Sequence, residues 1–400
     1  MRRLILLLFG CTIATALGML NTAGVADEIG VTDTAIKIGV ITPITGVQAH
    51  YGASHKTVTE LVAKEVNGSG GINGRKLELI IEDEGCSGTK ARAAIQKLVT
   101  RDQVFAVFGG TCAAAIVPSV PFLIENKVPY LTAMVIADSL TNPLSKYVFR
   151  AQVPATRIGR LMATYAIEAL SAKRLAIVNQ DDEYGAGELK GTLLELDKRK
   201  VTPVAHETHK LGDSDLSAQA LRLKNAEPDV VLVHSYAPQT AALLRKAYEL
   251  GLRARYIAGV ASGNTQILQL IGEEPSRGSF HAISVNVDPT GKVNPLTKDF
   301  VARYTAEYPE LAKRPGIPGP GEFQVIGGLT PFLEGLKRAG RELSRDRFIA
   351  ALESIRELKT PGYPTVTFSS DNHDGVLKAP FWYYNKDGNI LVTEKVYSTD

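Results

Sequence analysis

The feature that most constrains the fold is a regular alternation of short apolar runs with segments of helical periodicity. Four runs rich in β-branched residues begin the chain's ordered pattern: "IKIGVIT" from Ile36, "KLELIIED" from Lys76, "VFAVFGG" from Val104 and "VPYLTAM" from Val128. The segments between them, 54–67, 89–100 and 115–126, carry apolar residues at helical spacing. Strands that alternate with helices are joined by right-handed crossovers, so the pattern predicts a parallel sheet covered on both faces.

The same pattern starts again after residue 150. Strands are predicted in "RLAIVNQ" from Arg174, "DVVLVHS" from Asp229 and "RYIAGVA" from Arg255, and helices from about residues 158, 186 and 239. Helices are expected again over 296–308 and 323–339, followed by a hairpin that turns at Asp387-Gly388. Two such blocks predict an α/β fold of two doubly wound Rossmann-like lobes. Ligands of open parallel sheets lie at the carboxyl ends of the strands, so we expect a hinged cleft between the lobes.

The amino terminus has the layout of a secretory signal peptide. Arg2 and Arg3 precede a long apolar stretch, and small residues follow up to Ala26, after which we expect cleavage. A lipoprotein signal ending at Cys11 and an uncleaved anchor over 4–20 are the alternatives. No later stretch is long and apolar enough to cross a bilayer, so we expect a soluble exported protein in the periplasm.

Charge and motifs exclude several classes of function. The chain has 45 basic and 42 acidic residues, and loss of Arg2 and Arg3 with the signal leaves 43 against 42. A nearly neutral chain lacks the basic surface of a nucleic-acid binder. The sequence contains no G-x-S-x-G, Walker A or H-E-x-x-H motif, and "NGSGGINGRK" precedes a strand, as a turn does. We therefore expect neither an enzyme nor a cofactor.

Cysteines and histidines are the side chains of this sequence that could form a disulfide or bind a metal ion. Cys86 and Cys112 lie near the ends of predicted strands, and in an oxidising compartment they are expected to form a disulfide. The alternative is a pair of buried reduced thiols. His206 and His209 are the only closely spaced histidines and have no ligand set around them, so no metal site is expected.

Four segments together resemble a known family. "IKIGVITPITGVQAHYG", "VNGSGGINGRKLELIIEDEGC", "VFGGTCAAA" and "VNQDDEYGAG" are similar, in order and spacing, to the periplasmic leucine/isoleucine/valine-binding proteins of ABC transporters, which are type I periplasmic binding proteins. The resemblance covers the mature chain and includes the cysteine pair. It implies two lobes joined by three crossovers, a monomer, and docking of the closed, loaded form on a membrane permease. The implied division is a signal peptide over 1–26, an N-terminal lobe over 35–151 and 285–370, and a C-terminal lobe over 152–284 and 371–400.

The resemblance also assigns aromatic binding positions. It places Tyr51 at the mouth of the first lobe, where its ring covers the ligand, and Tyr184 and Tyr236 on the opposite wall. A packing role is the alternative for Tyr51.

Two departures from the family bear on the ligand. Where amino-acid binders have hydroxyl side chains, this chain has Ala113 and Ile136, with Met134 nearby, which leaves the N–H groups of Ala113 and Ala114 as anion donors unless Thr111 or Thr132 substitutes. Where they have an acid for the α-ammonium, it has Val260, unless Asp181, Asp182 or Glu183 compensates.

A buried ammonium without a partner is costly, so these departures predict a hydrophobic or aromatic carboxylate, with a branched-chain amino acid as the family default. We accordingly expect the solute-binding component of an ABC importer that works by lobe closure. The alternative is a sensor that presents its ligand to a signalling receptor.

Overall fold

The computed structural model describes residues 28–46, 48–210, 212–263, 265, 267–283, 295–314 and 316–399. The predicted signal peptide, residues 1–26, lies outside the described residues. Among the helices that are described, none is both long and apolar enough to span a bilayer.

The first sheet has five parallel strands in the order β2-β1-β3-β4-β5. Its strands are β1 (Ala35–Thr42), β2 (Lys76–Asp83), β3 (Ala106–Gly109), β4 (Tyr130–Thr132) and β5 (Val148–Arg150). The sequence predicted the first four. It missed β5, whose three residues are too few for a periodic pattern.

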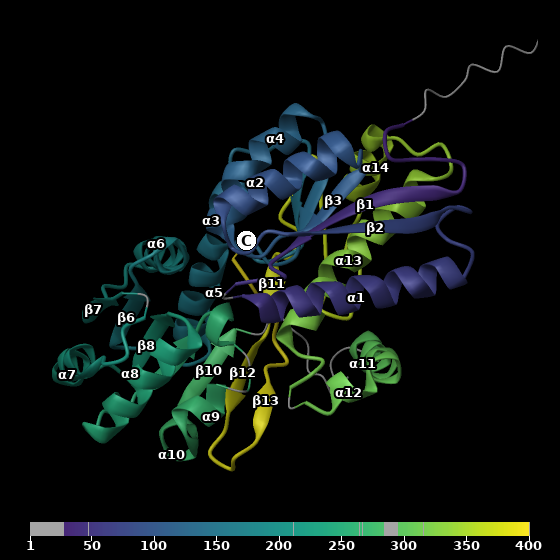
Figure 1. Cartoon of the computed structure of the whole chain (residues 1–400). Coiled ribbons are helices and arrows are strands. Elements are labelled where there is room, and N and C mark those ends of the chain that lie inside the picture. The colour runs from purple at the N-terminus through teal and green to yellow at the C-terminus, as the bar shows by residue number, and fades with distance from the viewer. Residues whose placement is uncertain are drawn as a thin grey trace, which may run out of the picture.

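Helices cover both faces of this sheet, as the apolar runs predicted (Figure 1). The helices of this lobe are α1 (Ala49–Gly68), α2 (Gly88–Gln96), α3 (Ala113–Ile116), α4 (Val120–Glu125), α11 (Pro295–Glu307), α12 (Pro309–Ala312), α13 (Pro320–Ala339) and α14 (Arg345–Glu353). Of these, α11 and α12 lie beyond α1 and not on the sheet (Figure 1). The lobe's last helices thus come from residues 295–353, although its last strand ends at Arg150, and α13 packs against both α1 and α14.

The second sheet has seven strands in the order β13-β12-β10-β9-β8-β6-β7. Its strands are β6 (Leu175–Gln180), β7 (Ala205–His209), β8 (Val230–His234), β9 (Arg255–Ala258), β10 (Phe280–Ile283), β12 (Phe381–Tyr384) and β13 (Ile390–Val392). Strands β6 to β10 are parallel, whereas β12 and β13 form the predicted antiparallel hairpin. The sheet of this lobe is therefore mixed at one edge.

The helices of this second lobe include the three predicted from the sequence. They are α5 (Ala155–Glu168), α6 (Glu183–Lys198), α7 (Ser217–Ala226), α8 (Ala237–Glu249), α9 (Ile267–Ile271) and α10 (Glu273–Ser276). A further short pair, β11 (Lys378–Ala379) and β14 (Tyr397–Ser398), lies beside α5. Helices α5 and α6 approach closely because Gly159 and Gly191 face the opposite backbone, where a Cβ atom would overlap a carbonyl oxygen.

The chain passes between the sheets after β5, after β10 and after Asp374 (Figure 1). At the first and third passages a buried arginine joins the two segments. The Arg150 guanidinium contacts the Asp374 carboxylate at 2.7 Å and donates to the Ala137 carbonyl oxygen and the Thr141 hydroxyl, both at 2.7 Å. The two sheets show where the core of each lobe lies, but they do not show at which residues a lobe ends. The boundaries of the N-terminal and C-terminal lobes therefore stay a prediction.

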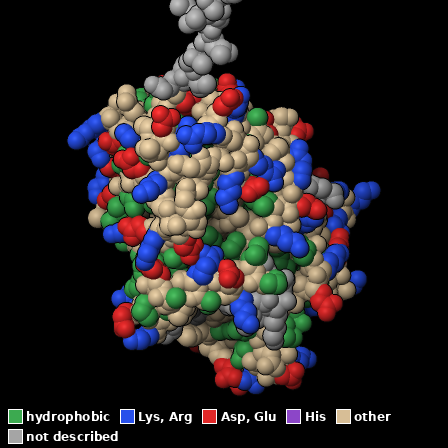
Figure 2. All heavy atoms as spheres, turned by 90° about the vertical axis from the view of Figure 1, so that its right-hand side faces the viewer, with side chains coloured by type: hydrophobic (Ala, Val, Ile, Leu, Met, Phe, Trp, Pro, Cys, Tyr) green, Lys and Arg blue, Asp and Glu red, His purple; other side chains and the backbone are tan. Residues whose placement is uncertain are grey.

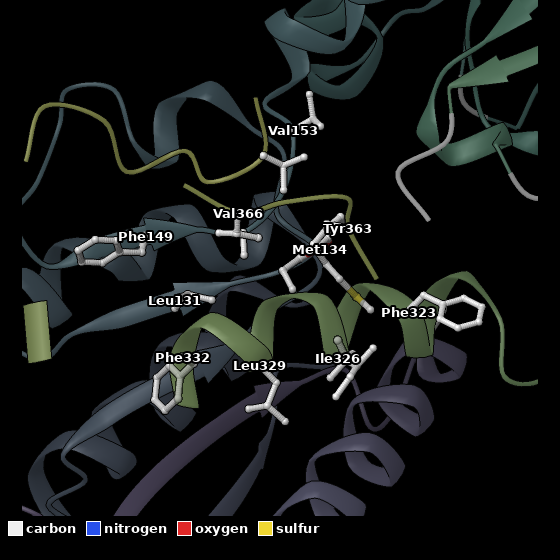
Figure 3. Packing of buried hydrophobic residues seen from close by; sticks show 14 of the residues in the cluster. Leu131, Met134, Phe149, Val153, Phe323, Ile326, Leu329, Phe332, Tyr363 and Val366 are labelled. Carbon is white, nitrogen blue, oxygen red and sulfur yellow. The ribbon is translucent and has the colours of Figure 1, made fainter. Parts of the chain in front are cut away.

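Apolar packing on α13 completes the first lobe. Ile326, Leu329 and Phe332 of this helix belong to one buried cluster with Leu131, whereas the Phe323 ring points away from Leu131 and packs against Phe300 (Figure 3). The surface, in contrast to this apolar core, carries charges of both signs. On the face drawn in Figure 2, Lys and Arg side chains are interspersed with Asp and Glu, so that face shows no large patch of one charge.

Candidate functional site

A cleft of about 380 Å³ lies at the carboxyl ends of the two sheets. Its wall contains all eight residues that the sequence singled out: Tyr51, Ala113, Ala114, Met134, Ile136, Tyr184, Tyr236 and Val260. The remaining lining residues are Gln48, Thr111, Cys112, Ala137, Gln152, Ala155, Asp182, Glu183, Ala261 and Gln324. Their shared position is shown by the structure, whereas their contact with a ligand stays a prediction.

A glycine turn after β3 carries the first-lobe wall. Gly109 and Gly110 have φ angles of 110° and 81°, and a Cβ atom on Gly110 would lie 2.6 Å from the Tyr130 hydroxyl. The chain then enters α3, where Ala115 and Ile116 donate to the Cys112 carbonyl oxygen. The N–H groups of Ala113 and Ala114 come before these first helical bonds, so the helix itself gives them no acceptor.

Hydrogen bonds to Glu84 and a disulfide to Cys86 fix the loop between β3 and α3 in place. Thr111 and Cys112 donate their N–H groups to Oε1 of Glu84, at 2.9 and 3.2 Å. The predicted disulfide between Cys86 and Cys112 is confirmed and ties the loop to the end of β2, with Cα atoms 5.2 Å apart. Burial of Glu84 raises the pKa of its carboxyl to about 7.

Hydroxyl groups near this wall already have partners. The Thr132 hydroxyl donates to the Gly110 carbonyl oxygen and accepts from the N–H groups of Met134 and Val135. Thr111 donates its hydroxyl to the Met134 sulfur at 3.6 Å. Thr132 is therefore a structural residue, while Thr111 keeps a position on the cleft wall.

Two stacked tyrosines form the second-lobe wall. The rings of Tyr184, in the first turn of α6, and Tyr236, at the amino end of α8, lie 4.9 Å apart at an interplanar angle of 22°. The Tyr184 hydroxyl accepts from the N–H of Ala261 at 3.3 Å. Burial raises the pKa of Tyr236 to about 12, with Asp182 and Glu188 adding to the effect, so both hydroxyls stay neutral at physiological pH.

The carboxylates of the 181–183 segment differ in their position. Asp182 and Glu183 line the cleft, whereas Asp181 is not among the lining residues. Asp182 caps α6 by accepting the Gly185 N–H at 2.9 Å, and its other oxygen accepts from the Gln180 amide. Glu183 is exposed, and Val260 begins a short 3₁₀ turn that follows β9.

A buried carboxylate–imidazole pair lies behind the tyrosine wall. Glu188 Oε2 is 3.0 Å from Nδ1 of His234, and His234 Nε2 is 3.0 Å from the Thr192 hydroxyl. The order hydroxyl, imidazole, carboxylate is that of a nucleophilic triad. However, all three residues are buried, and Thr192 donates its hydrogen to the Gly159 carbonyl oxygen at 3.1 Å. A substrate has no access to this hydroxyl, so the arrangement is structural.

The two closely spaced histidines have separate partners. His206 contacts the Asn179 amide oxygen at 2.7 Å, while His209 contacts the Ser235 hydroxyl at 2.7 Å. Both lie on β7 within hydrogen-bond networks of the second lobe.

Sequence reasoning missed several residues of the site. Gln324 enters from α13, and no local pattern connects that helix with the cleft. Glu84 and Glu188 were missed as well, although Glu188 follows Tyr184 by one helical turn and therefore lies on the same face of α6. An acid on the buried face of a predicted helix was the signal that could have found it.

Comparison with known proteins identifies the family. The periplasmic binding protein family matches residues 35–389. A leucine-, isoleucine-, valine-, threonine- and alanine-binding protein of Pseudomonas aeruginosa is 28% identical over 93% of this chain and 95% of its own. An amino acid binding protein of the same organism is 28% identical, over 60% of this chain and 62% of its own length. The chain belongs to the periplasmic binding protein family, in the group of the leucine/isoleucine/valine-binding proteins.

Solved structures confirm the type I periplasmic binding protein fold. The substrate-binding protein LivJ of Streptococcus pneumoniae, in complex with isoleucine, aligns with a TM-score of 0.74 and 23% identity, over 92% of this chain and 99% of its own. A solute-binding protein of Rhodopseudomonas palustris, in complex with 3,4-dihydroxybenzoic acid, aligns with a TM-score of 0.74 and 22% identity, over 92% and 98%. The predicted architecture of two Rossmann-like lobes around a cleft is thereby confirmed.

Proposed function

We propose that this protein is the periplasmic solute-binding component of an ABC importer and that its ligand is a small carboxylate with an aromatic or branched apolar body. The observation that carries the proposal is the composition of the cleft wall, whose lining residues include three tyrosines and eight apolar residues. In this proposal the protein is a monomer that closes its lobes on the ligand and presents it to a membrane permease. The lobe boundaries given above define the two moving parts.

The second-lobe wall favours a flat or apolar body over a zwitterion. Tyr184 and Tyr236 offer ring faces, and Val260 stands where the family's amino-acid binders place an acid. A ligand ring that stacks on such a pair gains roughly 0.5–1.5 kcal/mol beyond the area it buries. An α-ammonium would find Asp182, whose two oxygens are already engaged, or the exposed Glu183.

The first-lobe wall supports the carboxylate. Ala113 and Ala114 line the cleft, the first turn of α3 leaves their N–H groups without an acceptor in the helix, and their side chains are small. Both kinds of ligand occur among structural neighbours: the R. palustris protein holds 3,4-dihydroxybenzoic acid, and the S. pneumoniae protein holds isoleucine.

Matched ligand pairs test the proposal. Ligand-stripped protein is heated with leucine or 4-methylpentanoate, and with phenylalanine or 3-phenylpropanoate, since the members of each pair differ only in the ammonium group. A ligand that binds the folded state at 100 times its Kd stabilises it by ~2.7 kcal/mol, which raises Tm by several degrees. We expect a shift with the acids and none with the amino acids; stabilisation by leucine alone would refute the ligand class.

Variants of the wall separate binding from folding. Tyr184→Ala and Tyr236→Ala should weaken binding of the active acid and leave the fold intact, while Tyr248→Ala, at the far end of α8, serves as the matched control. If Tyr184→Ala or Tyr236→Ala unfolds the protein, the ring belongs to the core of the second lobe and not to the site.

A further inference from the structure

Glu84 is the ionisable group most closely coupled to the cleft without lining it. Its side chain is completely buried at the end of β2, and Oε1 accepts the N–H groups of Thr111 and Cys112. Thr111 and Cys112 themselves line the cleft. A single layer of loop backbone therefore separates the Glu84 carboxyl group from any ligand seated on the first-lobe wall.

The second oxygen of Glu84 is buried and has no hydrogen-bond partner among the described residues, and the same is true of the Thr42 hydroxyl and of both ring nitrogens of His55. Thr42 is adjacent, since its carbonyl oxygen accepts the Glu84 N–H at 3.0 Å, and the His55 ring lies against Gly109 of the same loop. A buried oxygen that accepts nothing favours the protonated form of the carboxyl, because an ionised oxygen there is costly.

We propose that Glu84 is the positioning residue of the loop between β3 and α3 and that its carboxyl group takes up a proton when the cleft binds an anion. The inference rests on the proposed function in so far as it takes the ligand to carry a carboxylate. An ionised Glu84 and an ionised ligand on opposite sides of one loop backbone repel each other across a low-dielectric layer. Protonation of Glu84 removes that repulsion while Oε1 keeps accepting from the loop.

The other titratable groups around Glu84 do not neutralise it. Asp83, next to it on the strand, adds a negative charge, and Lys90 contacts Asp83 and the Thr45 hydroxyl at the exposed edge. Tyr130 donates its hydroxyl to the Gly109 carbonyl oxygen and stays neutral, because burial raises its pKa. Burial lowers the pKa of His55 to about 3, so this ring supplies no positive charge near neutral pH.

The direction of the pH dependence follows from linkage. Burial raises the pKa of Glu84 to about 7, so the carboxyl group is largely protonated at pH 6 and largely ionised at pH 8. An anion binds the protonated form better, and affinity should therefore be constant at low pH and fall above pH 7. The limit is a tenfold loss per pH unit, which corresponds to one proton taken up per ligand.

The test uses benzoate as the probe and the full mature chain. Titration calorimetry at pH 7.5 in phosphate and in Tris, buffers with different ionisation enthalpies, measures the number of protons taken up on binding. Wild-type protein should take up a substantial fraction of a proton, and its Kd should rise at least threefold from pH 6.5 to pH 8.5. In Glu84→Gln the amide oxygen can still accept from Thr111 and Cys112, so we expect binding without proton uptake and a Kd that does not vary with pH.

Glu82→Gln is the matched control, because Glu82 lies on the same strand but pairs with Lys97 at the surface. This variant should keep the wild-type pH dependence. Binding of benzoate without proton uptake in wild type, or with unchanged uptake in Glu84→Gln, would overturn the inference. If leucine binds and benzoate does not, the proposed ligand class is wrong, and the same titration with leucine then decides on Glu84, because leucine carries the same carboxylate.

A ligand-free measurement covers the case in which no probe binds. Because the pKa of Glu84 is higher in the folded than in the unfolded chain, its stabilising contribution is complete at acid pH and declines as the pH rises through about 7. The Tm of wild type should fall between pH 5 and pH 8 by more than that of Glu84→Gln. Equal slopes would overturn the role of Glu84 irrespective of the ligand.

Discussion

Replacement of Glu188 by leucine should be among the most destabilising single changes in the second lobe. The Glu188 and His234 side chains are both fully inaccessible, and they contact each other at 3.0 Å behind Tyr184. Thr192 gives its hydrogen to Gly159, so His234 must donate from Nε2 to Thr192, and Nδ1 depends on Glu188 alone. Leucine at position 188 leaves that nitrogen buried without a partner, which costs about 1–3 kcal/mol.

Two further variants show whether the loss of stability in Glu188→Leu comes from the unpaired His234 nitrogen. Glu188→Gln retains a hydrogen bond to Nδ1 and should cost ~1 kcal/mol, the usual value for a weakened neutral bond. Glu188→Leu combined with His234→Leu removes both polar groups, so the double variant should be more stable than the sum of the single variants predicts, by ~1–3 kcal/mol.

Urea unfolding followed by circular dichroism and by tyrosine fluorescence measures these differences. The two probes report whether the lobes unfold together, which the use of one free energy of unfolding requires. Lys190→Gln, an exposed change on the same helix, is the control and should be neutral. A loss below 1 kcal/mol for Glu188→Leu, or strict additivity in the double variant, would refute the interpretation of the pair as mutually dependent.

Three further changes test other parts of the structure. Asp374→Ala leaves the buried Arg150 without its carboxylate partner. Because the Asp374 side chain is 21% exposed, we expect the free energy of unfolding, measured with urea, to fall by ~3 kcal/mol, near the lower limit for such pairs. An unchanged unfolding midpoint would show that Ala137 and Thr141 hold Arg150 without Asp374. Replacing both Cys86 and Cys112 by serine opens a loop with a sequence separation of 26, which should cost about 3.5 kcal/mol in the chain-entropy model, and reduction of the wild type should lower Tm similarly. Gly191→Ala should cost about 1–3 kcal/mol by thermal unfolding, because the added methyl group meets the Thr156 carbonyl oxygen between α5 and α6. Gly68→Ala, at the end of α1, is the control, because a Cβ atom there meets no neighbour.

Strands and helices with strong apolar periodicity could be predicted from the sequence. The runs from Ile36 and Lys76 became β1 and β2, and the segment 323–339 became most of α13. Strand β7, "AHETH", could not be recognised, because it is an edge strand whose alternate residues are exposed and polar. Local patterns also do not reveal that α13, which begins at Pro320, returns to the first lobe, since its partners α1 and β4 end at Gly68 and Thr132.

The cleft wall was predictable to the extent that it follows strand ends. Tyr184 and Tyr236 come just after β6 and β8, and Ala113 and Ala114 come just after β3, so a parallel sheet brings them to one edge. Gln324 does not follow a strand and was missed. Nor does the sequence state which polar groups are engaged: only the structure shows that the Thr132 hydroxyl is occupied within the loop and that Glu84 holds the N–H groups of Thr111 and Cys112.

The two walls of the cleft differ in the kind of recognition that they can provide. On the first lobe, the glycine turn and Glu84 fix a loop whose donors suit an anion. On the second lobe, Asp182 and Glu188 are engaged in capping and in the pair with His234, which leaves ring faces towards the cleft. Each lobe alone would therefore meet half of a carboxylate with an aromatic or branched body. In the proposed function a closed form satisfies both halves, and such a ligand would stabilise closure by its differential affinity for the closed state.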